Sequence, residues 1–226
     1  MKEHLLDHES SEDYEGMSKE DQIGFIRKVY GILSAQLIVT AIVCSFPVIL
    51  GDAYKVFVLE HVGLLILAII SIFTCIIMLT CCGFHRSVPA NYILTLIFTL
   101  SEAYLVSIIC ARYDPATVMT ATFMTASIVV GLTLYAVFTK TDFTACGGIL
   151  LCVLISFAFF GLFSIFFGFY LKIVYCTLGV ILFGIYLVFD TQMIVGNKSR
   201  AYSREDYILA AINLYLDIIQ IFVYIL

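Results

Sequence analysis

The 226-residue sequence has few charged residues, and long stretches of it carry no charge at all. Charged residues make up 13% of the chain and apolar residues 62%, whereas soluble domains contain roughly 25% charged and 45–50% apolar residues. This shortage of charge excludes a soluble globular domain of any size. The twelve Lys and Arg are scattered, with no basic run. That scatter argues against a nucleic-acid-binding surface, and we expect no nucleic-acid partner.

Patterns typical of catalysis or tightly bound cofactors are also missing. No Cys and His spacing is typical of a zinc site, and the cysteines lie inside or at the ends of hydrophobic segments, where free Cys acts as a small apolar residue. The last hydrophobic segment, residues 207–226, has no lysine to form a retinal Schiff base. No hydrophobic segment holds a cluster of histidines. We therefore expect neither an enzyme nor a bound cofactor, and the short loops disfavour a seven-helix receptor.

The first 28 residues form a polar, acidic leader. Eight of the seventeen acidic residues fall in the first 21 positions, where a signal peptide would be basic and then apolar. We expect residues 1–28 to be a disordered cytosolic leader. Residues 29–226 then form one membrane domain, because no later stretch resembles a domain boundary.

The membrane domain contains seven hydrophobic segments. A helix needs about 20 mostly apolar residues to cross the hydrocarbon core of a bilayer, and connections between the segments are short. The sequence therefore predicts an all-α, polytopic integral membrane bundle of seven helices. The expected spans are Val29–Gly51, Val62–Phe84, Asn91–Ala111, Pro115–Thr139, Phe143–Leu171, Ile173–Gln192 and Tyr207–Leu226.

The distribution of basic residues predicts the orientation of the bundle. Cytoplasmic loops of membrane proteins carry an excess of Lys and Arg. With a cytosolic N-terminus, nine basic residues lie on the cytosolic side and three on the other. The nine are Lys2, Lys19, Arg27, Lys28, Arg86, Lys140, Lys198, Arg200 and Arg204, against Lys55, Arg112 and Lys172. The sequon at Asn197 then faces the cytosol and is expected to stay unused.

Three acidic residues lie inside the predicted spans: Glu102, Asp190 and Asp217. No Lys or Arg lies within a span to neutralise them. Ionisable residues in a membrane are costly, so each is a candidate functional residue. The alternative is that each is protonated, or reaches a span end or a hydroxyl group. That alternative is weaker for Asp217, which lies about ten residues, or roughly 15 Å, into its span.

The last span carries a polar stripe. Asn213, Asp217 and Gln220 share one helical face through i, i+4 and i+7 spacing, and such a face must turn toward the bundle interior or a watery cavity. Carboxylate and carbonyl oxygens suit hard cations such as Ca²⁺. The residues therefore predict a cation or proton pathway, with Glu102, Asn213 and Gln220 in supporting roles. A proton-coupled cation transporter would show the same pattern.

Several short motifs resemble those of one known family. The run Asn213–Ile219, preceded by Phe189–Gln192, resembles the paired signature of the Bax inhibitor (Lifeguard) family of membrane proteins. Weaker matches are Phe25–Tyr30, Pro89–Asn91 and Phe98–Glu102. The matches run from residue 25 to 226, and the arrangement is most similar to the Golgi anti-apoptotic branch of that family.

The resemblance implies a seven-helix fold with a central, polar last segment, in Golgi or endoplasmic reticulum membranes. It also implies a pH-modulated Ca²⁺ leak that lowers store filling and suppresses apoptosis. In the family a pair of membrane aspartates, matching Asp190 and Asp217, forms a proton-sensitive centre that would bind Ca²⁺ transiently. A basic residue at the end of the second span latches that centre, and the aligned position here holds His85, with Arg86 beside it.

The expected partners are the lipid bilayer, Ca²⁺ and protons, together with cell-death regulators or Ca²⁺-release channels. A different class of function remains open, in which the chain is a membrane interaction protein without transport and the acids only fix helix packing. Ca²⁺ flux through the purified protein separates these alternatives.

Overall fold

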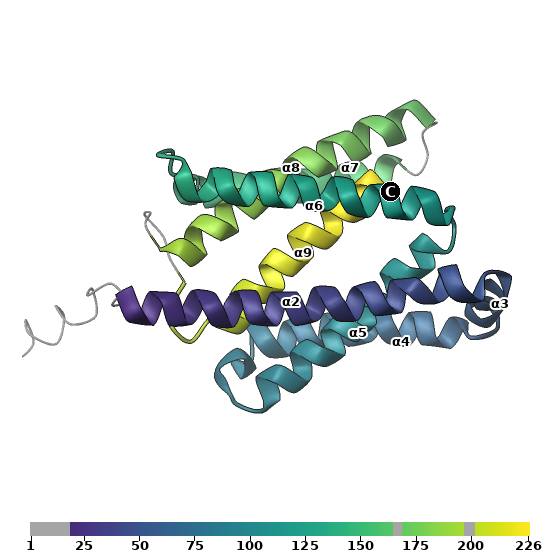
Figure 1. The fold of residues 1–226 in the computed structure, drawn as a ribbon, viewed down its shortest axis with the longest axis horizontal. Helices are drawn as coiled ribbons and strands as arrows, with labels where there is room; N and C mark the ends of the chain where they lie inside the picture. The colour runs from purple at the N-terminus through teal and green to yellow at the C-terminus, as the bar shows by residue number, and fades with distance from the viewer. Residues whose placement is uncertain (1–18, 165–168, 197–201) are drawn as a thin grey trace, which may run out of the picture.

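A computed structural model describes residues 19–164, 169–196 and 202–226, and these residues are almost entirely helical (Figure 1). They form eight α-helices, with no strand among the described residues. The helices are α2 (Lys19–Leu50), α3 (Asp52–Glu60), α4 (Val62–Thr80), α5 (Ala90–Cys110), α6 (Pro115–Phe138), α7 (Gly147–Ser164), α8 (Phe169–Val195) and α9 (Tyr207–Ile225), with short 3-10 turns η1 (Phe84–Arg86) and η2 (Thr144–Cys146). All but α3 are long and apolar enough to cross a membrane. The predicted all-α, polytopic membrane fold is therefore confirmed.

The first helix begins earlier than the sequence predicted. α2 starts at Lys19, so residues 19–28, expected to belong to the disordered leader, are helical. The cause is tertiary packing, because Phe25 is buried in the core and the Gln22 side chain donates a hydrogen bond to the Val195 carbonyl. The rest of the leader, residues 1–18, and the sequon at Asn197 lie outside the described residues.

The connection between the first two spans is also more ordered than expected. Residues 52–60, predicted as a loop, form the short helix α3. Tyr54 anchors it, since this side chain is 5% exposed and its hydroxyl lies 2.5 Å from Ser107 Oγ of α5. α3 thereby ties the end of α2 to the end of α5.

Helix α9 occupies the centre of the bundle. In Figure 1 it runs diagonally between α2, α4 and α5 on one side and α6, α7 and α8 on the other. It packs against α2, α5, α6 and α8, and it is the most buried of the seven spans. The expected central position of the last segment is confirmed.

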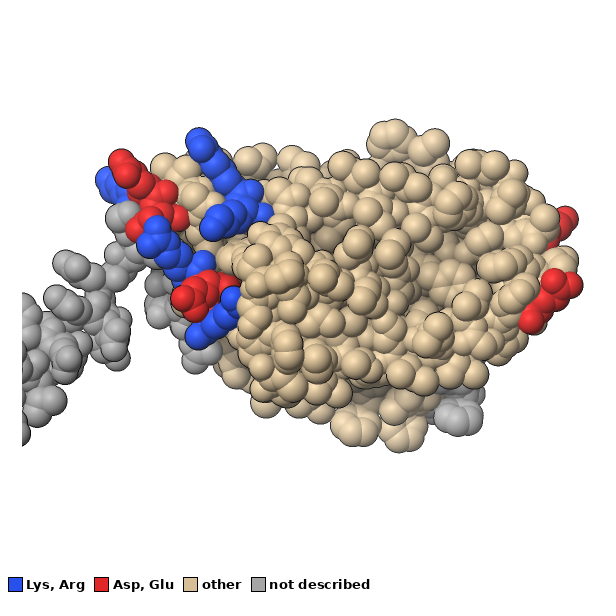
Figure 2. Space-filling view, turned by 90° about the horizontal axis from the view of Figure 1, so that it is seen from below, with Lys and Arg blue, Asp and Glu red and all other residues tan. Residues whose placement is uncertain are grey.

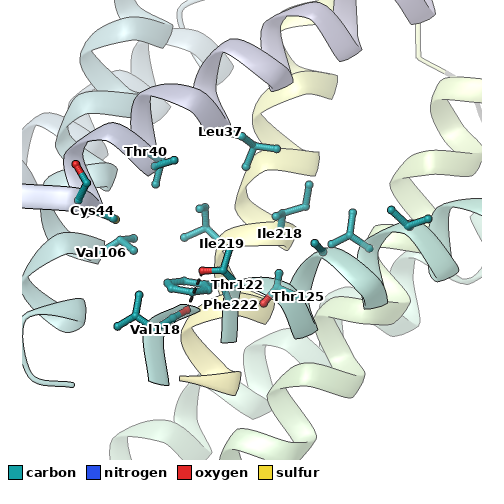
Figure 3. Close-up of a pocket in the computed structure, with 15 residues that line it drawn as sticks. Leu37, Thr40, Cys44, Val106, Val118, Thr122, Thr125, Ile218, Ile219 and Phe222 are labelled. Carbon is teal, nitrogen blue, oxygen red and sulfur yellow. Dashed lines mark hydrogen bonds between the residues drawn. The ribbon is translucent and has the colours of Figure 1, made fainter. Parts of the chain in front are cut away.

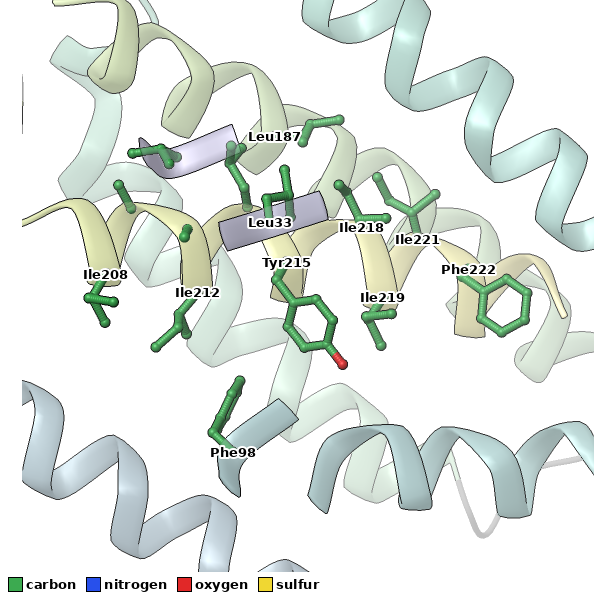
Figure 4. Close-up of a cluster of buried hydrophobic side chains, with 14 of the residues drawn as sticks. Leu33, Phe98, Leu187, Ile208, Ile212, Tyr215, Ile218, Ile219, Ile221 and Phe222 are labelled. Carbon is green, nitrogen blue, oxygen red and sulfur yellow. The ribbon is translucent and has the colours of Figure 1, made fainter. Parts of the chain in front are cut away.

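The core surrounds α9 on several sides. Figure 4 shows Leu33, Phe98 and Leu187 approaching it from three other helices. Tyr215 is fully buried, and its ring meets Phe98 edge to face with centroids 6.2 Å apart. A helix that is apolar on nearly every face belongs in the middle of a bundle, which explains why Asp217, 5% exposed, cannot reach water without a path between other helices.

Charged side chains gather at the two ends of the molecule. In Figure 2 a broad belt without Lys, Arg, Asp or Glu separates an end with both signs of charge from an end with acids alone. Large apolar side chains such as Ile49, Phe73 and Phe138 are exposed along the spans. A soluble protein rarely exposes so much apolar surface, so this belt is the surface that contacts lipid.

Candidate functional site

Asp190 and Asp217 meet where α8 packs on α9. Each side chain is only 5% exposed, and the two carboxyl groups lie within hydrogen-bonding reach of each other. Asp217 Oδ2 is buried and has no hydrogen-bond partner among the described residues. Two buried carboxylates at this separation cannot both be charged without an opposing cation, so the pair must share a proton or bind a cation.

Tyr202, which the sequence did not single out, also touches this pair. Its hydroxyl donates a hydrogen bond to Asp190 Oδ1 at 3.2 Å and accepts one from Asn213 Nδ2 at 2.7 Å. Burial raises the pKa of Tyr202 far above its usual value, and the neighbouring Asp190 carboxylate raises it further. The hydroxyl therefore remains a donor at neutral pH. A tyrosine in a polar connection gives no sequence signal for this role, because the contact depends on how the chain returns to α8.

The other polar residues of the predicted stripe are less enclosed. Asn213 is exposed and Gln220 is half-buried, so Asn213 does not face the bundle interior, one of the two surroundings expected for the stripe. This residue lies only two turns into α9, next to the preceding connection, where its amide reaches Tyr202 instead of the bundle interior.

His85 and Arg86 do not contact the carboxyl pair. Arg86 Nη2 lies 3.2 Å from Asp206 Oδ1, and His85 Nε2 lies 3.3 Å from the same oxygen. The latch prediction is therefore wrong about its target, because Arg86 meets Asp206, in the connection before α9, rather than Asp190 or Asp217. We call His85, Arg86 and Asp206 the clamp. Within the part of the chain that is described, no bond joins the two basic residues to Asp190 or Asp217.

The clamp is built on a well-fixed histidine. His85 Nδ1 lies 2.7 Å from the Leu79 carbonyl oxygen, which can only accept, so this nitrogen carries a hydrogen. Nε2 then accepts from Arg86 Nε at 3.1 Å. Burial alone would raise the pKa of Asp206, but hydrogen bonds from Ser203 and Arg86 and the charge of Arg86 outweigh it, and the pKa is lowered.

Comparison with known proteins assigns the sequence to a family. Residues 22–226 match the family model described as inhibitor of apoptosis-promoting Bax1. Protein lifeguard 3 of Homo sapiens is 35% identical over 210 residues, covering 89% of this chain and 67% of the relative, and its Mus musculus counterpart is 34% identical over 209 residues. Protein LIFEGUARD 4 of Arabidopsis thaliana is 35% identical over 210 residues, covering 91% of this chain and 83% of the relative. The chain belongs to the Bax inhibitor (Lifeguard) family.

In this Bax inhibitor family member, Glu102 lies away from the aspartate pair. It is half-buried on α5 and close enough to Tyr215 to affect that hydroxyl electrostatically. The Tyr215 hydroxyl lies 2.9 Å from Thr40 Oγ1. Because Tyr215 and Asp217 are two residues apart, they point about 200° apart around α9. Glu102 therefore belongs to a second polar seam, between α2, α5 and α9, and not to the α8–α9 pair.

A groove of about 500 Å³ opens between α2 and α6 and reaches α9 (Figure 3). Thr40 of α2 and Thr125 of α6 lie on its walls, and Ile219 and Phe222 form its α9 side. Thr125 donates its hydroxyl hydrogen to a backbone carbonyl of its own helix. Ser45 and Thr122 also line the groove, and their hydroxyls likewise donate to backbone carbonyls of their own helices. The rest of the lining is apolar, so this groove suits hydrocarbon and offers no route for an ion.

Proposed function

We propose that this protein is a pH-modulated Ca²⁺ leak of intracellular membranes, in the endoplasmic reticulum or Golgi, and that it suppresses apoptosis by lowering store Ca²⁺. Membership of a family described as inhibiting apoptosis-promoting Bax1 supports the anti-apoptotic part. The observation that carries the transport part is the buried Asp190–Asp217 pair, which forms no ion pair with a basic side chain among the described residues.

The pair is suited to exchange a proton for a cation. At about 4 Å, two carboxylates repel by roughly 4 kcal/mol at an effective dielectric of 20, so one shared proton and a charge-assisted hydrogen bond favour the packed arrangement of α8 and α9. A Ca²⁺ ion relieves the same repulsion. Proton and Ca²⁺ therefore compete for these oxygens, and flux through the pair must depend on pH.

The donor set suits a passing ion better than a resident one. Ca²⁺ takes six to eight oxygen ligands, whereas within the described ranges no three His, Cys, Asp or Glu side chains gather at one point. The two carboxylates supply part of a coordination shell, and Asp217 Oδ2 is an oxygen with no competing partner. Water must complete the shell, which keeps binding transient.

We also propose that the clamp end of the molecule faces the cytosol. Arg86 and Arg204 form ion pairs at the clamp end, and Lys28 lies over the ring of Tyr207 at the start of α9. In Figure 2 one end of the molecule carries both signs of charge, whereas the other end shows only acids in that view. The excess of basic residues on cytoplasmic segments gives this orientation.

The decisive experiment is Ca²⁺ flux through the purified chain in defined liposomes from pH 5 to pH 8. Wild type should pass Ca²⁺ with a pH-dependent rate, and Asp190→Asn and Asp217→Asn should each change that profile. Asp52→Asn is the matched control, because Asp52 is exposed at the other end of the bundle and pairs with Lys55 three residues on. If both pair variants keep the wild-type profile, the paired-carboxylate mechanism is wrong. If wild type passes no Ca²⁺, the chain is an interaction protein without transport.

A further inference from the structure

The segment before α9 links the clamp to the carboxyl pair by a continuous series of bonds. We call residues 202–206 the cap segment. At one end Asp206 is held by the clamp, and at the other end Tyr202 binds Asp190. The cap segment is also tied to α2, because Arg204 pairs with Asp21. Its position therefore depends on ion pairs at the membrane surface, which are weaker and more easily released than the packing of the spans.

Asp206 transmits the clamp through its two oxygens. Oδ1 faces Arg86 and His85, whereas Oδ2 accepts hydrogen bonds from Ser203 Oγ at 2.6 Å and from the Ser203 backbone N–H at 3.3 Å. One carboxylate thus joins η1 to the start of the cap segment, one residue away from Tyr202. If the clamp opens, Asp206 is free to move and the local turn at Ser203 loses its anchor.

Tyr202 connects the cap segment to Asp190, so a movement of the cap segment would reach this carboxyl. Its backbone N–H donates to the Met193 carbonyl at 3.2 Å, one turn beyond Asp190 on α8. Its hydroxyl reaches Asp190 Oδ1 and accepts from Asn213 of α9. The side chain therefore bridges α8 and α9 at the pair and covers the Asp190 carboxyl from the side of the cap segment.

We propose that Tyr202 is a positioning residue that carries the state of the clamp to Asp190. While Arg86, positioned by His85, holds Asp206, the Tyr202 hydroxyl stays on Asp190 Oδ1 and shields that carboxyl. When the clamp opens, the cap segment moves and the carboxyl becomes accessible from the cap side. In this chain the basic residues after the second span act on the pair indirectly, through the cap segment. The effect on Ca²⁺ rests on the proposed function, but the effect on carboxyl access does not.

Carboxyl access is measured directly by reacting the full chain in liposomes, at one fixed pH, with a membrane-permeant carbodiimide. Mass spectrometry of the tryptic peptides 173–198 and 205–226 separates modification of Asp190 from that of Asp217. Loss of one hydrogen bond is worth about 1 kcal/mol, or about 5-fold. Tyr202→Phe, which removes only the hydroxyl, and Arg86→Gln, which opens the clamp, should each raise Asp190 modification by about 5-fold.

The double variant decides whether the two effects share one route. If the clamp acts through Tyr202, Arg86→Gln should add nothing to Tyr202→Phe, and the increase should stay at about 5-fold. Independent action would instead multiply the effects to about 25-fold and overturn the proposal. Arg86→Lys, which keeps the charge, should restore part of the protection. Tyr175→Phe is the matched control, because it also removes one tyrosine hydroxyl, and that hydroxyl lies 3.2 Å from the Tyr224 hydroxyl rather than on Asp190; it should leave Asp190 modification unchanged.

Ca²⁺ flux on the same variants tests the functional consequence. Flux should rise in Arg86→Gln and in Tyr202→Phe, with no further rise in the double variant. A wild type that passes no Ca²⁺ overturns the proposed leak, while the carbodiimide pattern still decides the coupling. Unchanged Asp190 modification in both single variants overturns the coupling, whatever the flux.

Discussion

Replacing Gly179 by alanine should destabilise the bundle, whereas the same change at Gly184 should not. Both glycines are buried in the middle of α8. A Cβ atom at Gly179 would lie 2.7 to 2.9 Å from ring carbons of Tyr224 on α9. A Cβ atom at Gly184 would meet only one methyl group, Leu132 Cδ1, at 3.1 Å. The pair of substitutions therefore differs in packing alone.

The expected magnitudes follow from two opposing effects. Alanine is favoured over glycine inside a helix by about 1 kcal/mol, and this gain is common to both sites. Forcing an extra carbon into a packed interface costs roughly 1–3 kcal/mol. The ring of Tyr224 cannot yield freely, since it stacks on Phe183 at 5.8 Å and its hydroxyl lies 3.2 Å from Tyr175. Gly179→Ala should therefore be about 1–3 kcal/mol less stable than Gly184→Ala.

The assay is the unfolding of the two purified variants and the wild type in one detergent, followed by circular dichroism. We expect Gly184→Ala to match or slightly exceed the wild type in stability, because the Leu132 methyl can shift by a few tenths of an ångström. Equal stability of the two variants would show that α8 and α9 do not approach as closely as Gly179 and Tyr224 indicate. The close packing of α8 on α9, from which the difference is calculated, would then be wrong.

Three further predictions concern charged residues. Glu102→Gln should fold normally and alter Ca²⁺ flux only modestly, because Glu102 lies in the α2–α5–α9 seam; loss of membrane insertion would instead assign it a structural role. The lowered pKa of Asp206 means that its ionised form stabilises the fold above its unfolded pKa, near 3.9. The protection of cap-segment amides from hydrogen exchange, relative to the unstructured chain at the same pH, should therefore fall as the pH drops below about 4, and should do so less in Asp206→Asn. In sealed vesicles a cysteine placed at Asp52 should react only from the lumenal side and one at Glu205 only from the cytosolic side, and the reverse pattern would invert the proposed orientation.

The spans could be predicted from the sequence because each depends on a local property. About 20 apolar residues suffice for a crossing helix, and the observed helices from α4 to α6 begin and end within a few residues of their predicted bounds, apart from the end of α4. The pairing of Asp190 with Asp217 was also accessible, through a resemblance in the two motifs that carry them. The extension of α2 back to Lys19 was not, because it depends on Phe25 meeting a core that the sequence does not reveal.

The clamp and the cap segment could not be predicted for the same physical reason. The sequence places His85 and Arg86 at the end of a span. The acid that Arg86 binds, Asp206, lies 120 positions later in the chain, and the two meet only because the fold brings the connection before α9 next to η1. Composition marks Asp206 and Tyr202 only as members of a polar connection. Their partners become visible once α9 is known to start beside η1.

Helix α9 contributes side chains to two separate polar clusters, although most of its surface is apolar. Tyr215 points toward Thr40 and the α2–α5 side, whereas Asp217, about 200° away, points toward Asp190 and α8. Between them the helix is covered by apolar residues such as Ile219. A change at the pair therefore reaches the other seam only by moving α9 as a whole. Because the cap segment leads directly into α9, the proposed release of the clamp would loosen an anchor shared by the cover over the Asp190 carboxyl and the start of the central helix.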